Sequence, residues 1–166
     1  MKKVLVIGCP GSGKTTLSIK LADKLALPLV HLDRLFWRDN WKQTSRDEFD
    51  ELLMQELIKP RWIIDGNFSR TIPTRLKYCD TIIYLDFPRL VCLRSVLKRC
   101  LVSYGKSRPD MGGNCPEKVD FTFLKSVWQF NRTQRNKTYS LLKEQHDTKI
   151  IILHSRKQVK EFLRSI

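Results

Sequence analysis

Eight residues close to the N-terminus have the types and spacing of a loop that holds phosphate groups. Gly8-Cys9-Pro10-Gly11-Ser12-Gly13-Lys14-Thr15 fits the pattern G-x-x-x-x-G-K-[ST]. Its glycines allow successive backbone N–H groups to point at one anion. Lys14 can bridge the β- and γ-phosphates of a nucleotide, and the Thr15 hydroxyl can bind Mg²⁺. We therefore expect ATP and Mg²⁺ as cofactors, with contacts from Gly8, Pro10, Gly11, Ser12, Gly13, Lys14, Thr15 and Thr16.

A magnesium ion at this loop needs a second contact, which an acid at the end of a neighbouring strand can supply. Asp65 follows the apolar run 62–64, and Asp86 follows the run 82–85. We prefer Asp65, because Gly66 lets the backbone turn close to the phosphates. The alternative role for Asp86 is to cap the helix that follows it.

Phosphoryl transfer also needs positive charge around the transferring group, and arginine pairs well with two phosphate oxygens. Besides Lys14, the catalytic candidates are Arg94, Arg99, Arg108, Arg132 and Arg135, and Arg156 is a further candidate for the nucleotide. For each single arginine, the alternative is a solvated surface charge.

Short apolar runs alternate with helical patterns along the chain, which predicts an α/β fold with a sheet between two layers of helices. The expected strands cover 4–7, 29–32, 62–64, 81–85 and 149–153. Helices are expected from Lys14, over 45–58, from Pro88, over 119–145 and from Ser155, with a loop over 104–116. Ser45 with Glu48 forms a capping-box pattern, and Ser155 with Gln158 can cap the last helix. All 166 residues fit one domain.

The composition excludes several classes of protein. Hydrophobic residues make up 42% of the chain, which is enough for a core. Every apolar run is far shorter than the roughly 18 residues of a membrane span, and no signal-peptide core is visible, so we expect a cytoplasmic protein without a membrane partner. Five cysteines with no close pair argue against a disulfide framework or a zinc site.

The formal net charge of +14 is unevenly distributed. Residues 1–85 hold 14 basic and 10 acidic side chains, whereas residues 86–166 hold 17 and 7. No acid occurs between Asp86 and Asp110. Such a stretch suits an anionic partner, either a polyphosphate or a nucleic acid, or forms a solvated basic surface.

These motifs resemble the adenylate-kinase-like P-loop phosphotransferases over nearly the whole chain, and within them the branch called DNA topology modulation or FlaR-like proteins. The resemblance rests on the Gly8–Thr15 loop and on four further segments. These are His31-Leu32-Asp33 with Trp37 and Trp41, the run 62–68, Arg108-Pro109-Asp110, and Cys115-Pro116-Glu117. It implies a P-loop NTPase fold with a five-stranded parallel sheet ordered 2-3-1-4-5 and helices on both faces. It also implies a small acceptor-binding lobe over about 33–60 and a lid over about 103–118.

The resemblance also assigns residues to the acceptor side. The family's Asp-Gly-Phe-Pro-Arg segment, with its magnesium-side Asp and its Arg for the acceptor, is similar to Asp65-Gly66-Asn67-Phe68-Ser69-Arg70, with one extra residue. The implied acceptor contacts are therefore Asp65, Gly66, Asn67 and Arg70. The Gln that reads the AMP base is missing near Thr74, which argues against AMP. Arg94 and Arg99 flank the lid, where relatives bind donor phosphates.

Asp33 lies where relatives with hydroxyl acceptors carry an acid that orients or deprotonates the hydroxyl. The alternatives are a positioning role or a helix cap, and His31 is interpreted as structural. Trp37 and Trp41 can stack on a planar acceptor, or they can pack the lobe onto the core.

Three accounts of function follow. The first is an ATP-dependent small-molecule kinase whose acceptor is a nucleotide, nucleoside or other metabolite. The second is an NTP-binding regulator that binds nucleic acid weakly through its basic surface, although no helix-turn-helix, zinc-finger or RNA-recognition pattern is visible. The third is a nucleotide-binding protein without catalysis, against which the intact Lys14, Thr15 and Asp65 argue. Arginines that surround a bound triphosphate would account for only part of the surplus positive charge, which keeps the second account open. The lysines that such a site does not explain are Lys125, Lys137, Lys143, Lys157 and Lys160.

Overall fold

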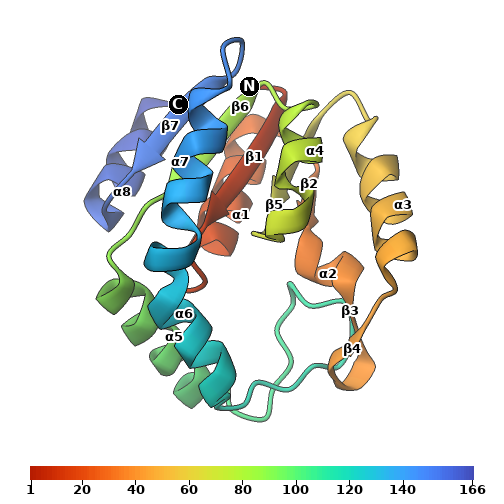
Figure 1. Ribbon diagram of the computed structural model, residues 1–166, viewed down its shortest axis with the longest axis vertical. Coiled ribbons are helices and arrows are strands. Elements are labelled where there is room, and N and C mark those ends of the chain that lie inside the picture. The colour runs from red at the N-terminus through yellow and green to blue at the C-terminus, as the bar shows by residue number, and fades with distance from the viewer.

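A five-stranded parallel sheet forms the centre of the computed structural model, which describes residues 1–166 (Figure 1). Its order is β2-β5-β1-β6-β7. Counted along the chain within this sheet, that order is 2-3-1-4-5, as predicted. The strands are β1 (Lys3–Gly8), β2 (Leu29–His31), β5 (Trp62–Asp65), β6 (Thr81–Leu85) and β7 (Lys149–Leu153). All four pairings are parallel, so the carboxyl ends of the strands meet at one edge.

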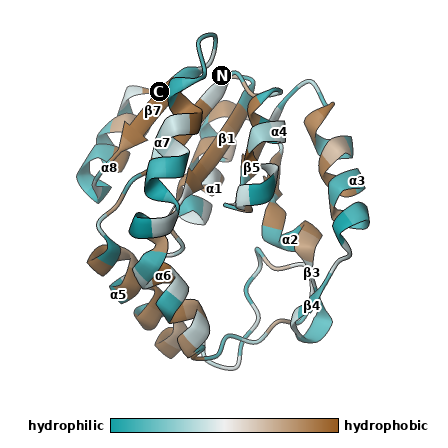
Figure 2. Cartoon of the chain, viewed as in Figure 1, coloured by the Kyte–Doolittle hydropathy of each residue, from teal (hydrophilic) through white to brown (hydrophobic).

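Helices cover both faces of the sheet, which confirms the three-layer α/β fold. The longer ones are α1 (Lys14–Leu25), α3 (Arg46–Leu57), α5 (Arg89–Val102), α6 (Phe121–Thr133), α7 (Arg135–Lys143) and α8 (Arg156–Ser165). Alternate residues of β1 point to opposite faces. Val4 and Val6 pack in the core cluster of α1, α5, α6 and α8, whereas Leu5 and Ile7 pack in that of α3, α4 (Ile72–Leu76) and α7. Figure 2 shows that the central strands are apolar.

Both predicted helix caps are present. The Ser45 hydroxyl accepts a hydrogen bond from the Glu48 N–H, and the Ser155 hydroxyl accepts one from the Gln158 N–H. No helix in the structure combines the length and hydrophobicity that a membrane span requires.

The helix predicted over 119–145 is wrong, because α6 and α7 are separate helices that meet at Gln134. Gln134 has φ −113° and ends α6. The two halves bury their apolar residues in different places: Val127 and Phe130 of α6 join the cluster on one face of the sheet, and Leu142 of α7 joins the cluster on the other. One straight helix cannot reach both faces, so the chain bends.

The region 33–60 holds more structure than its one predicted helix. The second strand ends at His31, one residue before the predicted end, because Leu32 begins the short helix α2 (Leu32–Phe36). A hairpin follows, formed by β3 (Trp37–Arg38) and β4 (Lys42–Gln43) around the 3-10 turn η1 (Asp39–Trp41). The two-residue strands β3 and β4 are below the length at which hydrophobic alternation is visible in a sequence.

A second 3-10 turn, η2 (Ser69–Thr71), lies outside this region and precedes α4.

One fully buried arginine holds the turn after β5. Arg75 donates hydrogen bonds to the carbonyls of Gly66 at 2.9 Å, Asn67 at 2.6 Å, Phe68 at 3.1 Å and Thr71 at 3.4 Å. Burial lowers the pKa of Arg75 to about 9, so the guanidinium is still protonated at neutral pH. Arg75→Met should destabilise the fold by about 3 kcal/mol, because these carbonyls would remain buried without donors.

Chemical denaturation monitored by circular dichroism measures this effect. Arg61→Met is the matched control, because Arg61 is exposed and donates one hydrogen bond, to the Ala26 carbonyl. Equal losses of unfolding free energy in the two variants would contradict the structural role of Arg75.

Candidate functional site

The glycine-rich loop connects β1 to α1 at the carboxyl edge of the sheet. Gly13 precedes α1, whose first residue is Lys14, so the N-terminus of a 12-residue helix points at the loop. A Cβ on Gly11 would collide with the carbonyl of Cys92 in α5. The chain therefore requires glycine at position 11 for α5 to pack directly against the loop.

The Lys14 ammonium lies inside this loop. Its Nζ donates to the carbonyls of Gly8 at 2.9 Å and Cys9 at 3.1 Å. Burial lowers the pKa of Lys14, and the nearby carboxylates of Asp65 and Asp33 oppose that shift. The ammonium thus lies in the cleft, and its contact with phosphates stays a prediction.

Strand register places Asp65 beside the loop. Asp65 is the partner of Val6 on one side and of His31 on the other. Its Oδ1 lies 2.8 Å from His31 Nδ1, while its buried Oδ2 has no hydrogen-bond partner. Burial would lower the pKa of His31, but the hydrogen bond to Asp65 and the charges of Asp65 and Asp110 outweigh it, so the pKa is raised. His31 thus orients Asp65, in agreement with the structural role expected of it.

Gly66 is required beside Asp65. It has φ +127°, and a Cβ there would lie 2.8 Å from the Cβ of Leu32. This close turn brings Asn67 to the loop, where its Oδ1 accepts a hydrogen bond from the Gly8 N–H at 3.4 Å.

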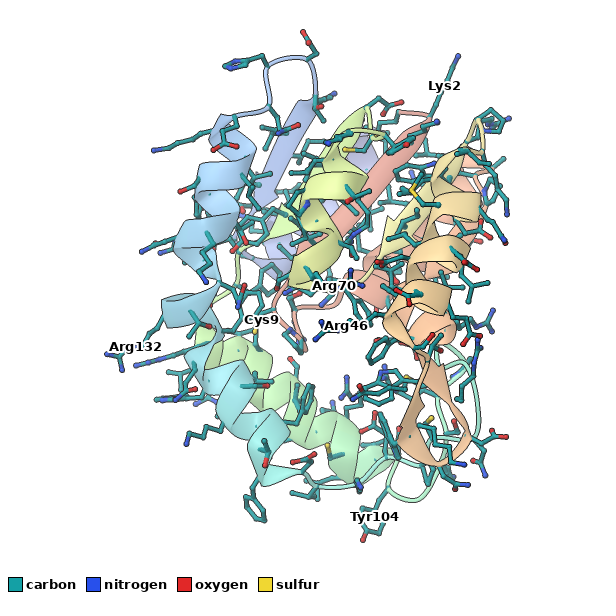
Figure 3. All side chains as sticks on the ribbon, turned by 45° about the vertical axis from the view of Figure 1, so that its right-hand side comes forward. Lys2, Cys9, Arg46, Arg70, Tyr104 and Arg132 are labelled. Atoms are coloured by element: carbon teal, nitrogen blue, oxygen red, sulfur yellow. The ribbon has the colours of Figure 1, made fainter.

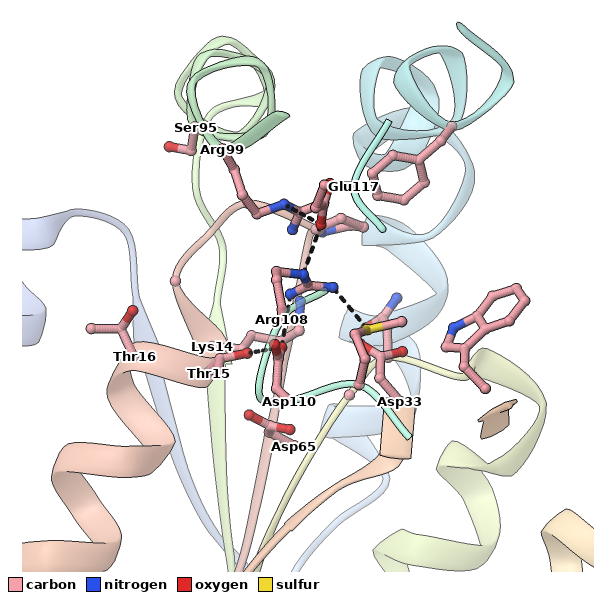
Figure 4. A pocket seen from close by; sticks show the side chains of 18 of the residues that line it. Lys14, Thr15, Thr16, Asp33, Asp65, Ser95, Arg99, Arg108, Asp110 and Glu117 are labelled. Atoms are coloured by element: carbon pink, nitrogen blue, oxygen red, sulfur yellow. Dashed lines mark hydrogen bonds and ion pairs between the residues drawn. The ribbon is translucent and has the colours of Figure 1, made fainter. Parts of the chain in front are cut away.

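The segment 103–118 reaches across to the loop and carries a chain of opposite charges (Figure 4). Arg108 lies 2.8 Å from Asp110 and 2.7 Å from Glu117, and Arg99 of α5 lies 3.1 Å from the same Glu117. The Thr15 hydroxyl donates to Asp110 Oδ2 at 3.2 Å. In this arrangement Arg99 and Arg108 line the same cleft as the glycine-rich loop, where their guanidinium groups can bind phosphate.

These elements enclose a cleft of about 840 Å³, which we call the central cleft. Predicted site residues that line it are Pro10, Gly11, Gly13, Lys14, Thr15, Thr16, Asp33, Trp37, Trp41, Asp65, Gly66, Asn67, Arg99, Arg108 and Arg156. Of the remaining loop residues, Gly8 forms the hydrogen bond to Asn67 and Ser12 is buried without a partner for its hydroxyl.

Four predicted arginines do not line the cleft. Arg94 lies on the exposed side of α5, because α5 buries Cys92, Val96 and Cys100. Arg132 is exposed on α6 and points away from the molecule in Figure 3. The other two have acidic partners elsewhere.

Arg135 forms two short contacts with Asp86, through Nε at 2.9 Å and Nη2 at 2.8 Å, and Tyr139 donates to the same carboxylate at 2.7 Å. The bend between α6 and α7 places Arg135 against Asp86, which follows β6, while Arg132 is exposed on α6. Asp86 binds these groups instead of capping α5, whose N-terminus has no side-chain cap.

Arg70 pairs with Asp50 of α3, through Nη1 at 2.7 Å and Nη2 at 2.6 Å. This exposed pair holds α3 against the turn after β5. Arg70 does not line the central cleft, and its contact with an acceptor stays a prediction.

The two tryptophans line the central cleft and also pack against each other. Their ring centroids are 5.3 Å apart in an edge-to-face contact. Trp41 Nε1 donates to the Pro116 carbonyl at 3.1 Å, which joins the hairpin to the 103–118 segment. The ring of Phe36 packs against Phe49 and Phe68, so it supports the lobe rather than the cleft.

Reasoning from the sequence missed several cleft residues, above all Asp110 and Glu117. Both occurred in quoted motifs, and Asp110 ends the acid-free stretch, but neither received a role. The available signal was the closeness of Asp110 to Arg108 in the chain, because an acid near a basic residue can form an ion pair with it. Ser95, Gln43, Met111 and Phe123 also line the cleft.

The residues present fit a Mg²⁺ ion that is held jointly with a nucleotide. No group of three or more His, Cys, Asp or Glu side chains is arranged to hold a metal without other ligands. Mg²⁺ in nucleotide sites typically uses one or two carboxylates with substrate phosphates and water. The Thr15 hydroxyl and the unpartnered Oδ2 of Asp65 match that requirement.

Comparison with solved structures shows the fold. A candidate kinase from Chloroflexus aurantiacus is similar over 99% of this chain and 97% of its own, with a TM-score of 0.56 and 18% identity. Shikimate kinase from Bacteroides thetaiotaomicron is similar over 98% and 94%, with a TM-score of 0.55 and 17% identity. No family model matches the chain, and no curated protein matches it. The closer resemblance to DNA topology modulation proteins thus stays a prediction, while the chain shares the α/β fold of these two proteins.

Proposed function

We propose that this chain is a kinase that transfers the γ-phosphate of ATP to a hydroxyl group of a small molecule. One observation carries the proposal: Asp33 lines the same cleft as Lys14 and Thr15, and its carboxylate has no ion-pair or hydrogen-bond partner (Figure 4). An acid that only capped a helix would be bound to backbone N–H groups. A free carboxylate across the cleft from the phosphate loop suits a group that accepts a proton from an attacking hydroxyl.

The donor side supplies the charge that phosphoryl transfer needs. Lys14 lies in the loop, and Arg99 and Arg108 enter from the opposite wall. Positive groups on two sides can neutralise the charge on the equatorial oxygens of the transferring group. Bound Mg²⁺ would supply further charge next to Thr15 and Asp65.

Neither arginine of the turn after β5 lines the central cleft. Arg70 is committed to Asp50, and Arg75 is buried among backbone carbonyls. A nucleoside monophosphate would need a cation for its phosphate, whereas Trp37, Trp41 and Asn67 suit a planar, uncharged molecule. We therefore infer an acceptor that carries a ring and a free hydroxyl, as nucleosides and ring alcohols do.

A panel of nucleosides, ring alcohols and nucleoside monophosphates, each with ATP and Mg²⁺, tests the proposal by detection of the phosphorylated product. We expect transfer to at least one unphosphorylated compound. Arg70→Ala should leave the KM for that acceptor unchanged, because the side chain lies outside the cleft. Transfer to monophosphates alone would overturn the hydroxyl acceptor, and slow ATP hydrolysis with no transfer would argue against a kinase.

The nucleic-acid alternative has no comparable support. The five lysines whose charge a triphosphate site does not explain are exposed on α6, α7 and α8, outside the cleft. Weak nucleic-acid binding through this surface stays a prediction.

A further inference from the structure

Asp110 is an acid of the lid segment that is held against the glycine-rich loop. It is 6% exposed, and its Oδ2 accepts hydrogen bonds from the Thr15 hydroxyl at 3.2 Å and from Arg108 Nη1 at 2.8 Å. Thr15 is the residue whose hydroxyl binds Mg²⁺ in loops of this pattern. A carboxylate that is hydrogen-bonded to this hydroxyl therefore lies beside the place that the metal ion of a bound nucleotide would take.

The position of Asp110 is set by contacts on both sides. Arg34 of α2 donates two hydrogen bonds to the neighbouring Pro109 carbonyl, at 3.0 and 2.7 Å. A Cβ on Gly112 would collide with the carbonyls of Arg34 and Trp37, so the lid backbone lies directly on the acceptor lobe. Arg108, which binds Asp110, is itself held by Glu117. These contacts hold the Asp110 carboxylate at a buried position beside Thr15, where Arg108 compensates its charge.

A second observation at the same place points to a cation. Asp65 is also buried, lines the same cleft, and its Oδ2 has no hydrogen-bond partner in the protein. Figure 4 shows the carboxylate of Asp110 joined to Thr15 and the carboxylate of Asp65 in the same pocket. Lys14 does not pair with either one, since its ammonium is bound to the carbonyls of Gly8 and Cys9.

We propose that Asp110 is a lid-borne ligand of the Mg²⁺–nucleotide complex, so that the metal site is complete only when the lid lies against Thr15 and Asp65. This proposal rests on the proposed function for the presence of a nucleotide. Two carboxylates, one hydroxyl and phosphate oxygens form a donor set that Mg²⁺ prefers. The lid then contributes through one short segment both a cation for phosphate, Arg108, and an anion for the metal, Asp110.

Calorimetric titration with ADP, in Mg²⁺ and again in EDTA, tests this proposal without measuring activity. Wild type should bind ADP more tightly in Mg²⁺ than in EDTA. Asp110→Asn should weaken binding in Mg²⁺ about tenfold or more, and should leave binding in EDTA unchanged or tighter. Mn²⁺ electron paramagnetic resonance with ADP provides a second readout, in which the variant should hold less bound Mn²⁺. Asp110→Glu, which keeps the charge, should retain part of the effect of Mg²⁺.

Asp39→Ala is the matched control. Asp39 holds the other side of the lid, by accepting a hydrogen bond from the Asn114 N–H at 2.6 Å, and does not line the central cleft. Its replacement should change ADP affinity by the same factor in Mg²⁺ and in EDTA.

The alternative is that Asp110 blocks the loop by occupying the place of a phosphate. In that case Asp110→Asn would tighten ADP binding equally in both conditions, which would overturn the proposal. An unchanged preference of the variant for Mg²⁺ would also overturn it, while the kinase function would stand. If wild type bound no ADP in either condition, the proposed function itself would be wrong, and the role of Asp110 would be rejected with it.

Discussion

Lys14→Ala is expected to lower the kcat of γ-phosphate transfer by about 10³-fold, or ~4 kcal/mol of transition-state stabilisation. The Lys14 ammonium is enclosed by the loop and bound to the carbonyls of Gly8 and Cys9. No other lysine or arginine forms part of the loop, so the charge that it contributes has no replacement. Steady-state kinetics with the acceptor found in the panel measures the effect.

Lys20→Ala provides the control, because Lys20 lies on the same helix, α1, and is exposed. It should keep wild-type kinetics. A kcat for Lys14→Ala within threefold of wild type would mean that the loop does not act on a transferring phosphate, and the thermal midpoint of both variants checks that they are folded.

Asp33→Asn is expected to lower kcat by about 10²- to 10³-fold with a smaller change in the KM for ATP. Asparagine keeps the size of the side chain but cannot accept the proton of the hydroxyl. Burial raises the pKa of Asp33 above the ordinary range of a carboxyl group, while the charges of Arg108 and Lys14 oppose this rise. Because the base acts when deprotonated, the acid limb of the kcat/KM profile should lie at higher pH than for an ordinary aspartate, and the variant should lack that limb.

Asp23→Asn is the matched control, since Asp23 is exposed on α1 away from the cleft. Residual ATP hydrolysis without acceptor should be equal in all three proteins, because water needs no placement by Asp33. Full transfer activity in Asp33→Asn would reject the hydroxyl acceptor and reduce Asp33 to a structural residue.

The central sheet was predictable because its strands are short, buried and continuous in apolar residues. The runs 4–7, 62–64, 81–85 and 149–153 all lie within observed strands. A parallel strand that is buried on both faces leaves an unmistakable local pattern. The hairpin β3–β4 and the bend at Gln134 leave none, because packing against distant residues determines them.

The residues of the central cleft were also predictable only in part. The glycine-rich loop and Asp65 were identified from contiguous residues, and strand register brings them together. The arginines were chosen for their charge and from the family resemblance, and here the predictions separate. Arg99, Arg108 and Arg156 line the cleft, whereas Arg94, Arg132, Arg135 and Arg70 do not. Which way a surface arginine points depends on the acids that neighbouring elements present to it.

The sequence by itself determined the α/β order of elements, the phosphate loop and the acids at the strand ends, because each is set by residues that are neighbours in the chain. Only the tertiary structure decided the partners of the charges. In that structure Arg70 forms an ion pair with Asp50, and Arg135 forms one with Asp86. The Thr15 hydroxyl donates a hydrogen bond to Asp110, which lies 95 residues later in the chain. Ion pairs and lid contacts are formed between side chains far apart in the chain, and no local spacing encodes them. The positions of the acids that pair with arginines therefore determine which cations are available in the cleft, and the net charge of +14 does not.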